Sequence, residues 1–167
     1  MTIEHPHAST ERILSVIPNV AVQAGFMGFK SRVYSLIISN NRIVFALLDD
    51  GLMWQLGQQE REQAKAQGMG TMGQWSASFQ AWDRLVQHYI QQGPDGILAE
   101  NPENFAVDRA DVSAVKLKST GSGAAGSPRL DYLILKTTGK KYKALLAGGK
   151  DEARAALEVA GLLTSKR

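Results

Sequence analysis

Two apolar runs joined by a polar pair constrain the fold of this chain more than any other feature of its sequence. The runs span residues 33–39 and 42–48, with Asn40 and Asn41 between them. Both are rich in β-branched and aromatic residues, and asparagine tolerates the positive φ of a tight two-residue turn. The segment therefore predicts a β-hairpin. Because apolar residues follow one another at 36–38 and 43–45, we expect burial on both faces of each strand.

Five more segments have the composition of strands. Residues 11–24 predict one extended segment that is bent or broken at Pro18, and 105–107 and 112–118 predict two short strands. Residues 130–137 and 140–146 predict a second hairpin, joined through Thr138 and Gly139. A helix follows at about 151–163, acidic at its start and with small apolar residues on one face. The order predicts an α+β fold, mainly β, in which seven strands precede a C-terminal helix.

The middle of the chain is helical in character. Residues 58–67 and 74–92 contain strong helix formers, with glycine-rich residues 68–73 between them. In the second stretch an apolar residue recurs at spacings of 4, 3, 4 and 3, which places Trp75, Phe79, Trp82, Val86 and Tyr89 on one stripe. We interpret 50–104 as a helical insertion that covers the first hairpin. The candidate apolar pocket or partner face comprises Trp54, Trp75, Phe79 and Trp82.

Length and composition fit a single domain over residues 1–167 with a disordered tail at 1–10. No apolar run approaches the roughly 18 residues that a membrane span requires. The N-terminal residues lack the basic and apolar parts of a secretory signal, and cysteine is absent. We therefore expect a cytoplasmic protein, at most peripheral to the inner membrane face.

Two motifs of the chain resemble bacterial pleckstrin-homology-like and GRAM-type domains. Residues 34–46, a strand, a polar turn and a second strand, look like the second hairpin of that group. Residues 105–115 are similar to its step from a short strand through a polar turn into the next strand. Ser39 stands where threonine is usual, Asn41 stands where a basic residue is usual, and residues 49–104 have no counterpart in a minimal domain. The resemblance implies a seven-stranded bent sheet or partly open barrel, with the insertion between the third and fourth strands.

Signatures of catalysis or cofactor binding lack the context that they need. The glycine pattern at 68–73 follows a polar helical segment, whereas a dinucleotide site requires a preceding strand. Of the three histidines, two lie in the tail and His88 has no acid at helical ligand spacing. No cysteine is present, and no serine lies in a nucleophile elbow. We expect no enzyme activity, no cofactor and no metal site.

Positive charge gathers in the C-terminal part. Residues 105–167 contain 12 Lys and Arg against 6 Asp and Glu, whereas residues 1–104 contain 7 against 10. Lysines cluster around the Thr138–Gly139 turn, and Lys116, Lys118 and Arg129 belong to adjoining segments. The loop between the first two strands, where phosphoinositide-binding members of the family usually have basic residues, adds two cations. The candidate anion or lipid site is Lys30, Arg32, Lys136, Lys140, Lys141 and Lys143.

These features favour a non-catalytic binding or scaffold module that docks a protein, a peptide or an anionic lipid surface. One alternative is a carrier of lipids or other hydrophobic small molecules, with a pocket under the inserted helices. The other is a nucleic-acid binder that uses the basic C-terminal strands with Tyr132 and Tyr142 as stacking platforms. Nucleic acid is the less favoured partner, and homo-oligomers through sheet edges or the inserted helices stay open.

Overall fold

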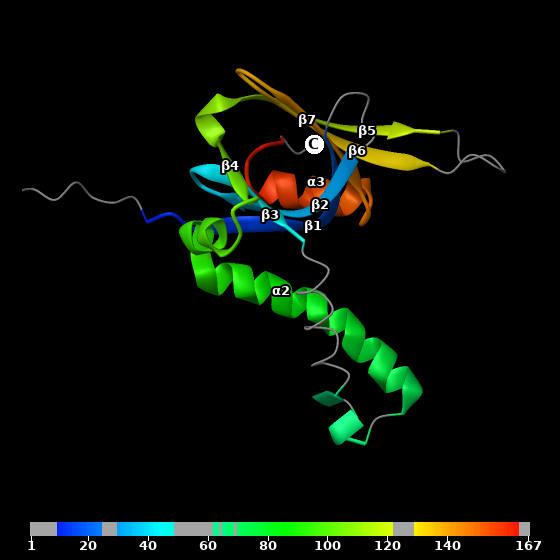
Figure 1. The fold of residues 1–167 in the computed structure, drawn as a ribbon. Coiled ribbons are helices and arrows are strands. Elements are labelled where there is room, and N and C mark those ends of the chain that lie inside the picture. Colours follow the sequence, from blue (N-terminus) through cyan, green and yellow to red (C-terminus); the bar gives the residue numbers. More distant parts are fainter. Residues whose placement is uncertain are drawn as a thin grey trace, which may run out of the picture.

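The computed structural model describes residues 10–24, 30–48, 62–63, 65–68, 70–121 and 129–163, with only the backbone at 24, 30–31 and 71–81. Within them the protein is α+β and mainly β, as predicted (Figure 1). No helix of this part is long and apolar enough to cross a bilayer. The predicted tail lies outside the described residues except for Thr10.

A seven-stranded antiparallel sheet has the order β4-β3-β2-β1-β7-β6-β5. Strands that follow one another in the chain are paired, with one exception: β4 and β5 are not paired and form the two edges of the sheet. The two halves of the sheet are joined by the pairing of β1 with β7. The hairpin predicted around Thr138 and Gly139 is confirmed. The strands are β1 (Ile13–Ala24), β2 (Lys30–Ser39), β3 (Arg42–Leu47), β4 (Phe105–Asp108), β5 (Val112–Thr120), β6 (Leu130–Thr137) and β7 (Lys141–Leu146).

Strand β1 is bent at the predicted proline. Its pairing with β2 shifts register between Ile17 and Val20, and Asn19 has a φ of 54°. A proline lacks the N–H that a central strand would use, so an irregularity is needed here. After the bend β1 pairs with both β2 and β7, which makes it the link between the two halves of the sheet.

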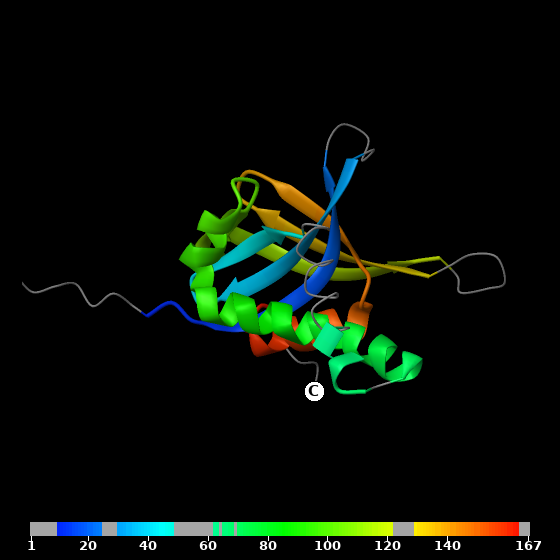
Figure 2. The same cartoon turned by 60° about the horizontal axis from the view of Figure 1, so that its bottom comes forward.

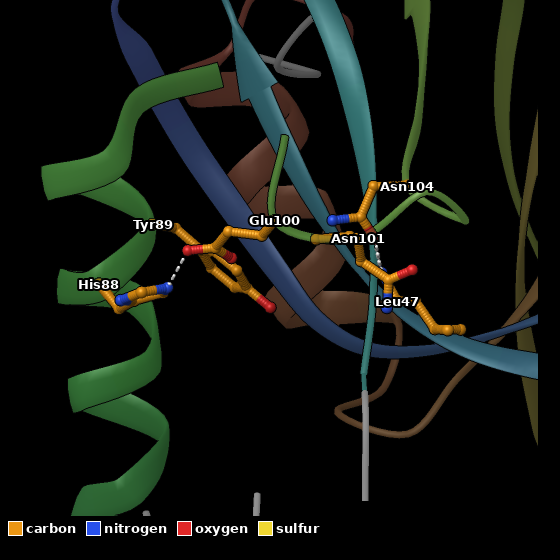
Figure 3. Close-up of a pocket in the computed structure, with 7 residues that line it drawn as sticks. Leu47, His88, Tyr89, Glu100, Asn101 and Asn104 are labelled. Carbon is orange, nitrogen blue, oxygen red and sulfur yellow. Dashed lines mark hydrogen bonds and ion pairs between the residues drawn. The ribbon is translucent and has the colours of Figure 1, made fainter. Parts of the chain in front are cut away.

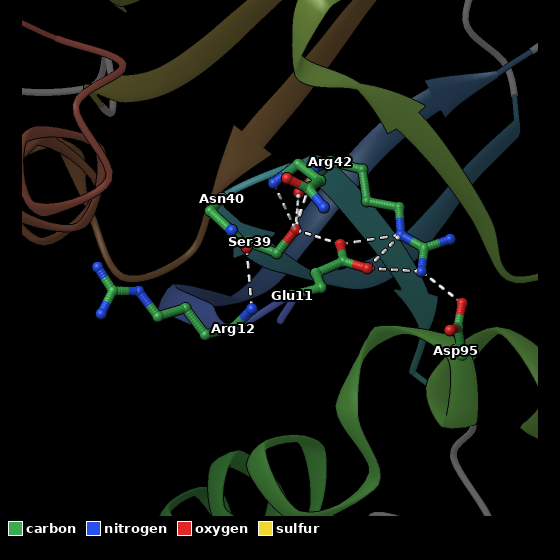
Figure 4. A network of polar contacts seen from close by, with 7 residues as sticks. Glu11, Arg12, Ser39, Asn40, Arg42 and Asp95 are labelled. Carbon is green, nitrogen blue, oxygen red and sulfur yellow. Dashed lines mark hydrogen bonds and ion pairs between the residues drawn. The ribbon is translucent and has the colours of Figure 1, made fainter. Parts of the chain in front are cut away.

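The turn between β2 and β3 is closed differently from the prediction. Neither Asn40 nor Asn41 has a positive φ. Instead, the buried hydroxyl of Ser39 accepts hydrogen bonds from the N–H groups of Asn41 (3.2 Å) and Arg42 (2.9 Å). The Asn40 side chain accepts one from the N–H of Arg12 (2.8 Å) (Figure 4). Hydrogen bonds to side-chain oxygens, and not a positive φ at either asparagine, therefore stabilise the turn.

The two faces of the β2–β3 hairpin contribute to two different cores, as predicted. Leu36, Ile38 and Phe45 belong to the core that contacts helix α3 (Lys150–Val159). Ile37 and Val44 alternate with them and pack against helix α2 (Thr71–Glu100). Figure 2 shows α2 running along one side of the sheet. The continuous apolar runs therefore result from burial on both faces.

Helix α2 is longer than the sequence indicated. Gly93, with φ 68° and ψ 169°, interrupts it where the predicted helix ends, but the helix then resumes with Pro94 and continues to Glu100. Proline suits this place because the first turn of a helix needs no N–H partner. The result is one kinked element whose Tyr89 and Ile97, on either side of the kink, both contact the sheet.

Helix α3 is held at both ends by side chains from the sheet or its connections. Asp131 accepts a hydrogen bond from the N–H of Lys150 (3.1 Å) at its start. At its end, Arg109 donates to the carbonyl of Ala160 (2.7 Å) and, through its other terminal nitrogen, to that of Ser39 (3.0 Å). Arg109 begins the short 3₁₀ helix η2 (Arg109–Asp111), which connects β4 to β5.

Candidate anion-binding face

Strands β5, β6 and β7 bring five lysines onto one face of the sheet. Side chains of directly paired residues, and of residues two apart on a strand, share a face. The lysines lie in three consecutive rows of paired residues. We name this surface the lysine face. Its first row contains Lys118, Tyr132 and Leu145, its second row contains Lys116, Ile134 and Lys143, and its third row contains Ala114, Lys136 and Lys141.

The lysine face points away from helix α3. The residues that alternate with it, such as Leu133, Leu135 and Ala144, are buried in the core that contacts α3. Ile134 is only 7% exposed although it belongs to neither apolar core. Its partners across the sheet are Lys116 and Lys143, and lysine side chains cover apolar surface with their aliphatic stems while the ammonium stays in water.

One lysine is fixed at the centre of the face by an aromatic ring. The Nζ atom of Lys143 lies 4.3 Å from the centroid of the Tyr132 ring. A cation over a tyrosine face is stabilised by the electrostatic quadrupole of the ring. The contact keeps positive charge at the middle row and covers that face of the ring.

Carboxylates do not neutralise this charge. Among the residues that the structure describes, none lies within 4.0 Å of a charged nitrogen of the five lysines. Asp131, on β6 itself, belongs to the other face, where it accepts a hydrogen bond from Ser119 (2.6 Å). That bond, together with Lys150 N–H and Arg129, keeps the pKa of Asp131 below its ordinary value. Its charge is therefore engaged away from the lysine face.

The six cations predicted as one site divide into separate places. Lys136, Lys141 and Lys143 lie together with Lys116 and Lys118. Lys140 instead lies over the Tyr142 ring, 5.1 Å from its centroid, and Tyr142 packs against the α3-side core. Arg32 is exposed and forms an ion pair with Glu103, whose hydrogen bond raises the Arg32 pKa. The side chain of Lys30 lies outside the described residues.

The apolar candidates form part of a packed interface where they can be described. Trp54 lies outside the described residues, and Trp75 and Phe79 are described only by their backbone within α2. Trp82 is partly buried against the α2-side core, which contains fully buried Tyr89. Burial raises the pKa of the Tyr89 phenol, while the nearby Ser35 hydroxyl opposes that rise. Trp82 and Tyr89 therefore pack against the sheet at this part of the stripe.

A small pocket lies where the kinked end of α2 meets β3 (Figure 3). The kink brings His88 and Glu100 together, with Nε2 and Oε1 2.5 Å apart, so His88 has an acidic partner that helical spacing does not reveal. The side chain of Asn104 connects β3 to α2: it accepts a hydrogen bond from the N–H of Leu47 and donates one to the carbonyl of Ile97, both at 2.7 Å. No described group of three or more acidic or histidine side chains could hold a metal. The cavity measures about 250 Å³ and is lined by Ala46, Leu47, His88, Tyr89, Glu100, Asn101 and Asn104.

The lysine face places five positive charges on one face of the described sheet. No family model, curated protein or solved structure matches the chain, so comparison with known proteins assigns no role to the lysine face. What the face can do follows from its own chemistry. Compact ammonium groups attract phosphate and carboxylate groups as point charges, without the fixed two-pronged geometry of arginine.

Proposed function

We propose that this protein is a non-catalytic binding module of the pleckstrin-homology-like type, which docks onto an anionic lipid surface through its lysine face. The observation that carries the proposal is the gathering of five lysines without carboxylate partners among the described residues. The strand order, open between β4 and β5, and the terminal helix support the family. In this view α2 belongs to the insertion between the third and fourth strands, which adds a layer to the domain.

The dimensions of the lysine face suit a surface. Three strands and three rows of paired residues cover roughly 10 Å by 14 Å. Each lysine near an anionic leaflet contributes about 1 kcal/mol of attraction, which salt screens. Five lysines therefore supply several kcal/mol without any specific pocket. Because ammonium groups act as point charges, lipid headgroups can bind such a patch in many arrangements.

Single-stranded nucleic acid fits the lysine face less well. Proteins that bind it combine positive charge with exposed aromatic rings on which bases stack. Lys143 covers one face of the Tyr132 ring, and Tyr142 contacts Phe45 and Phe105 on the α3 side of the sheet. Lys143 therefore leaves at most one face of the Tyr132 ring for stacking, and Tyr142 packs on the opposite side of the sheet from the lysines.

Reversing three lysine charges should abolish most binding to anionic vesicles. We expect the wild-type protein to pellet with phosphatidylserine-containing vesicles, to pellet less as salt is raised, and not to pellet with neutral phosphatidylcholine. The triple variant Lys118→Glu, Lys136→Glu, Lys141→Glu should bind at least roughly a hundredfold more weakly, since three attractions of about 1 kcal/mol are lost. It spares Lys116 and Lys143, which cover Ile134.

A charge-matched variant separates the lysine face from net charge. Arg12→Glu, Lys65→Glu, Lys140→Glu changes three exposed cations outside the face and should retain most of the vesicle binding. Equal weakening by both variants would contradict the proposal, as would pelleting that persists at high salt. Tighter binding to a polynucleotide than to vesicles, lost in the lysine-face variant, would replace lipid by nucleic acid as the partner.

A further inference from the structure

The outer edge of β4 presents backbone groups that no strand of the described sheet meets. The N–H of Arg109 donates to the carbonyl of Asn41 (2.9 Å), in line with the pairing of β4 and β3. Antiparallel pairing alternates, so Val107 also directs its N–H and C=O toward β3, whereas Ala106 and Asp108 direct theirs away. Since β4 is an edge strand, no other strand of the described sheet meets these groups.

Two adjoining cavities follow this edge. The first, of about 330 Å³, lies between β4 and the β6–β7 turn, and the second, of about 380 Å³, continues toward the start of β2. Lys140 and Tyr142 line both cavities, so we treat them as one edge groove. The first is lined by Ala106, Val107, Asp108, Asp111, Thr137, Thr138, Gly139, Lys140 and Tyr142, and the second by Val22, Gln23, Tyr34, Phe105, Lys140, Lys141 and Tyr142.

The edge groove has an aromatic wall and two charged ends. The rings of Phe105 and Tyr142 stack with centroids 5.8 Å apart, and Tyr34 meets Phe105 edge-on at 5.7 Å. Asp108 and Asp111 line only the first cavity and Lys141 lines only the second, while Lys140 lines both. The groove therefore favours an occupant with an apolar middle, a negative end beside the lysines and a positive end beside the aspartates.

We propose that the edge groove binds an extended peptide, which adds a strand to β4. Only another extended backbone presents N–H and C=O groups at the two-residue repeat of Ala106 and Asp108. An apolar side chain of the peptide packs against the wall formed by Phe105 and Tyr142. Its acidic side chain pairs with Lys140 or Lys141. A lipid chain or a nucleic acid would offer no matching row of hydrogen-bond partners to the outward N–H and C=O groups of β4. This site shares Lys141 with the lysine face, whereas the backbone groups of β4 belong to the groove alone.

The backbone bonds can be tested with matched peptides and the full chain. The probes are blocked five-residue peptides with a central phenylalanine flanked by valine or leucine, glutamate at one end and lysine at the other, in both orders. We expect at least one to bind and to slow the amide hydrogen exchange of Ala106 and Asp108 at least about tenfold at saturation. The same peptide N-methylated at alternate amides should bind at least about tenfold more weakly. Equal binding of the methylated peptide, protection at β5 instead of β4, or no binding by any probe would overturn the proposal.

A proline tests the same edge from the protein side. Ala106→Pro removes an N–H that points away from β3, and edge strands tolerate proline at such positions. We expect the variant to fold, to bind the peptide at least about tenfold more weakly and to bind vesicles like the wild type. Normal peptide binding by a folded Ala106→Pro variant would contradict strand addition. If the variant does not fold, the N-methylated peptide still tests whether the peptide forms backbone hydrogen bonds with β4.

Charge variants then separate the two sites. Lys140→Gln should weaken binding of the peptide, whereas Arg12→Gln should not. The double variant Lys118→Glu, Lys136→Glu changes two residues of the lysine face that do not line the groove. It should keep the exchange protection at β4 while it weakens vesicle binding. Loss of β4 protection in that double variant would contradict the separation of the two sites.

Discussion

Phe45→Ala is expected to lower the free energy of unfolding by about 3–5 kcal/mol. Phe45 is 1% exposed and its ring stacks on Phe105 with centroids 4.5 Å apart, while Tyr142 lies 5.2 Å away. It thus links β3 to β4 and β7 across the core on the α3 side. Alanine removes the ring contacts and leaves a cavity. A typical domain has only about 5–15 kcal/mol of stability, so the loss would be severe.

Chemical denaturation followed by circular dichroism measures this effect, with Ile90→Ala as control. Ile90 is a large apolar residue on α2 but is 51% exposed, so its truncation should cost less than about 1 kcal/mol. Comparable losses for the two variants would contradict the placement of Phe45 at the centre of the core.

Arg42→Ala is expected to lower the free energy of unfolding by about 2–3 kcal/mol at neutral pH. Its guanidinium bonds Glu11 through Nε (3.0 Å) and a terminal nitrogen (2.7 Å), and the same nitrogen contacts Asp95 of α2 (Figure 4). Glu11 also accepts from the Ser39 hydroxyl at 2.5 Å. One arginine thus connects the segment before β1, the hairpin and α2. Arg12→Ala is the control, because Arg12 uses its backbone N–H in the contact with Asn40, and it should change stability by less than about 0.5 kcal/mol.

The same network should make stability depend on pH on the acidic side. The Arg42 hydrogen bonds hold the pKa of Glu11 below its ordinary value in the folded protein. The unfolded chain therefore binds the proton first, and the contribution of Glu11 is present above its unfolded pKa and lost as pH falls through the folded one. The stability difference between wild type and Glu11→Gln should shrink from neutral pH to below about pH 4. A difference that is constant over this window would contradict the ion pair.

Much of the fold could be predicted because its cause is local. The apolar runs at 36–38 and 43–45 indicated burial on both faces, and the structure places α3 on one face and α2 on the other. Pro18 predicted the bend of β1. The β2–β3 turn was predicted with the wrong mechanism. The Ser39 hydroxyl closes it by accepting from the N–H groups of Asn41 and Arg42, and the same hydroxyl donates to Glu11, which is 28 residues away in the chain.

The candidate site was predictable only in part because its geometry depends on pairing between strands. The clustering of Lys136, Lys141 and Lys143 is visible in the sequence. The register that puts Lys116 in the row of Lys143, and leaves Lys140 on a different side, is set by the β5–β6–β7 pairing. The partner of His88 was missed for a similar reason, since the kink at Gly93 returns Glu100 to it.

The most direct test of the lysine face is the accessibility of each lysine to acetylation, measured by mass spectrometry with and without phosphatidylserine-containing vesicles. We predict that Lys118, Lys136 and Lys141 are modified several-fold more slowly when vesicles are bound, while Lys65 and Lys140 react as in the free protein. Neutral vesicles should change none of these rates. Protection of Lys65 and Lys140 with no protection of the lysine face would contradict the proposed docking mode.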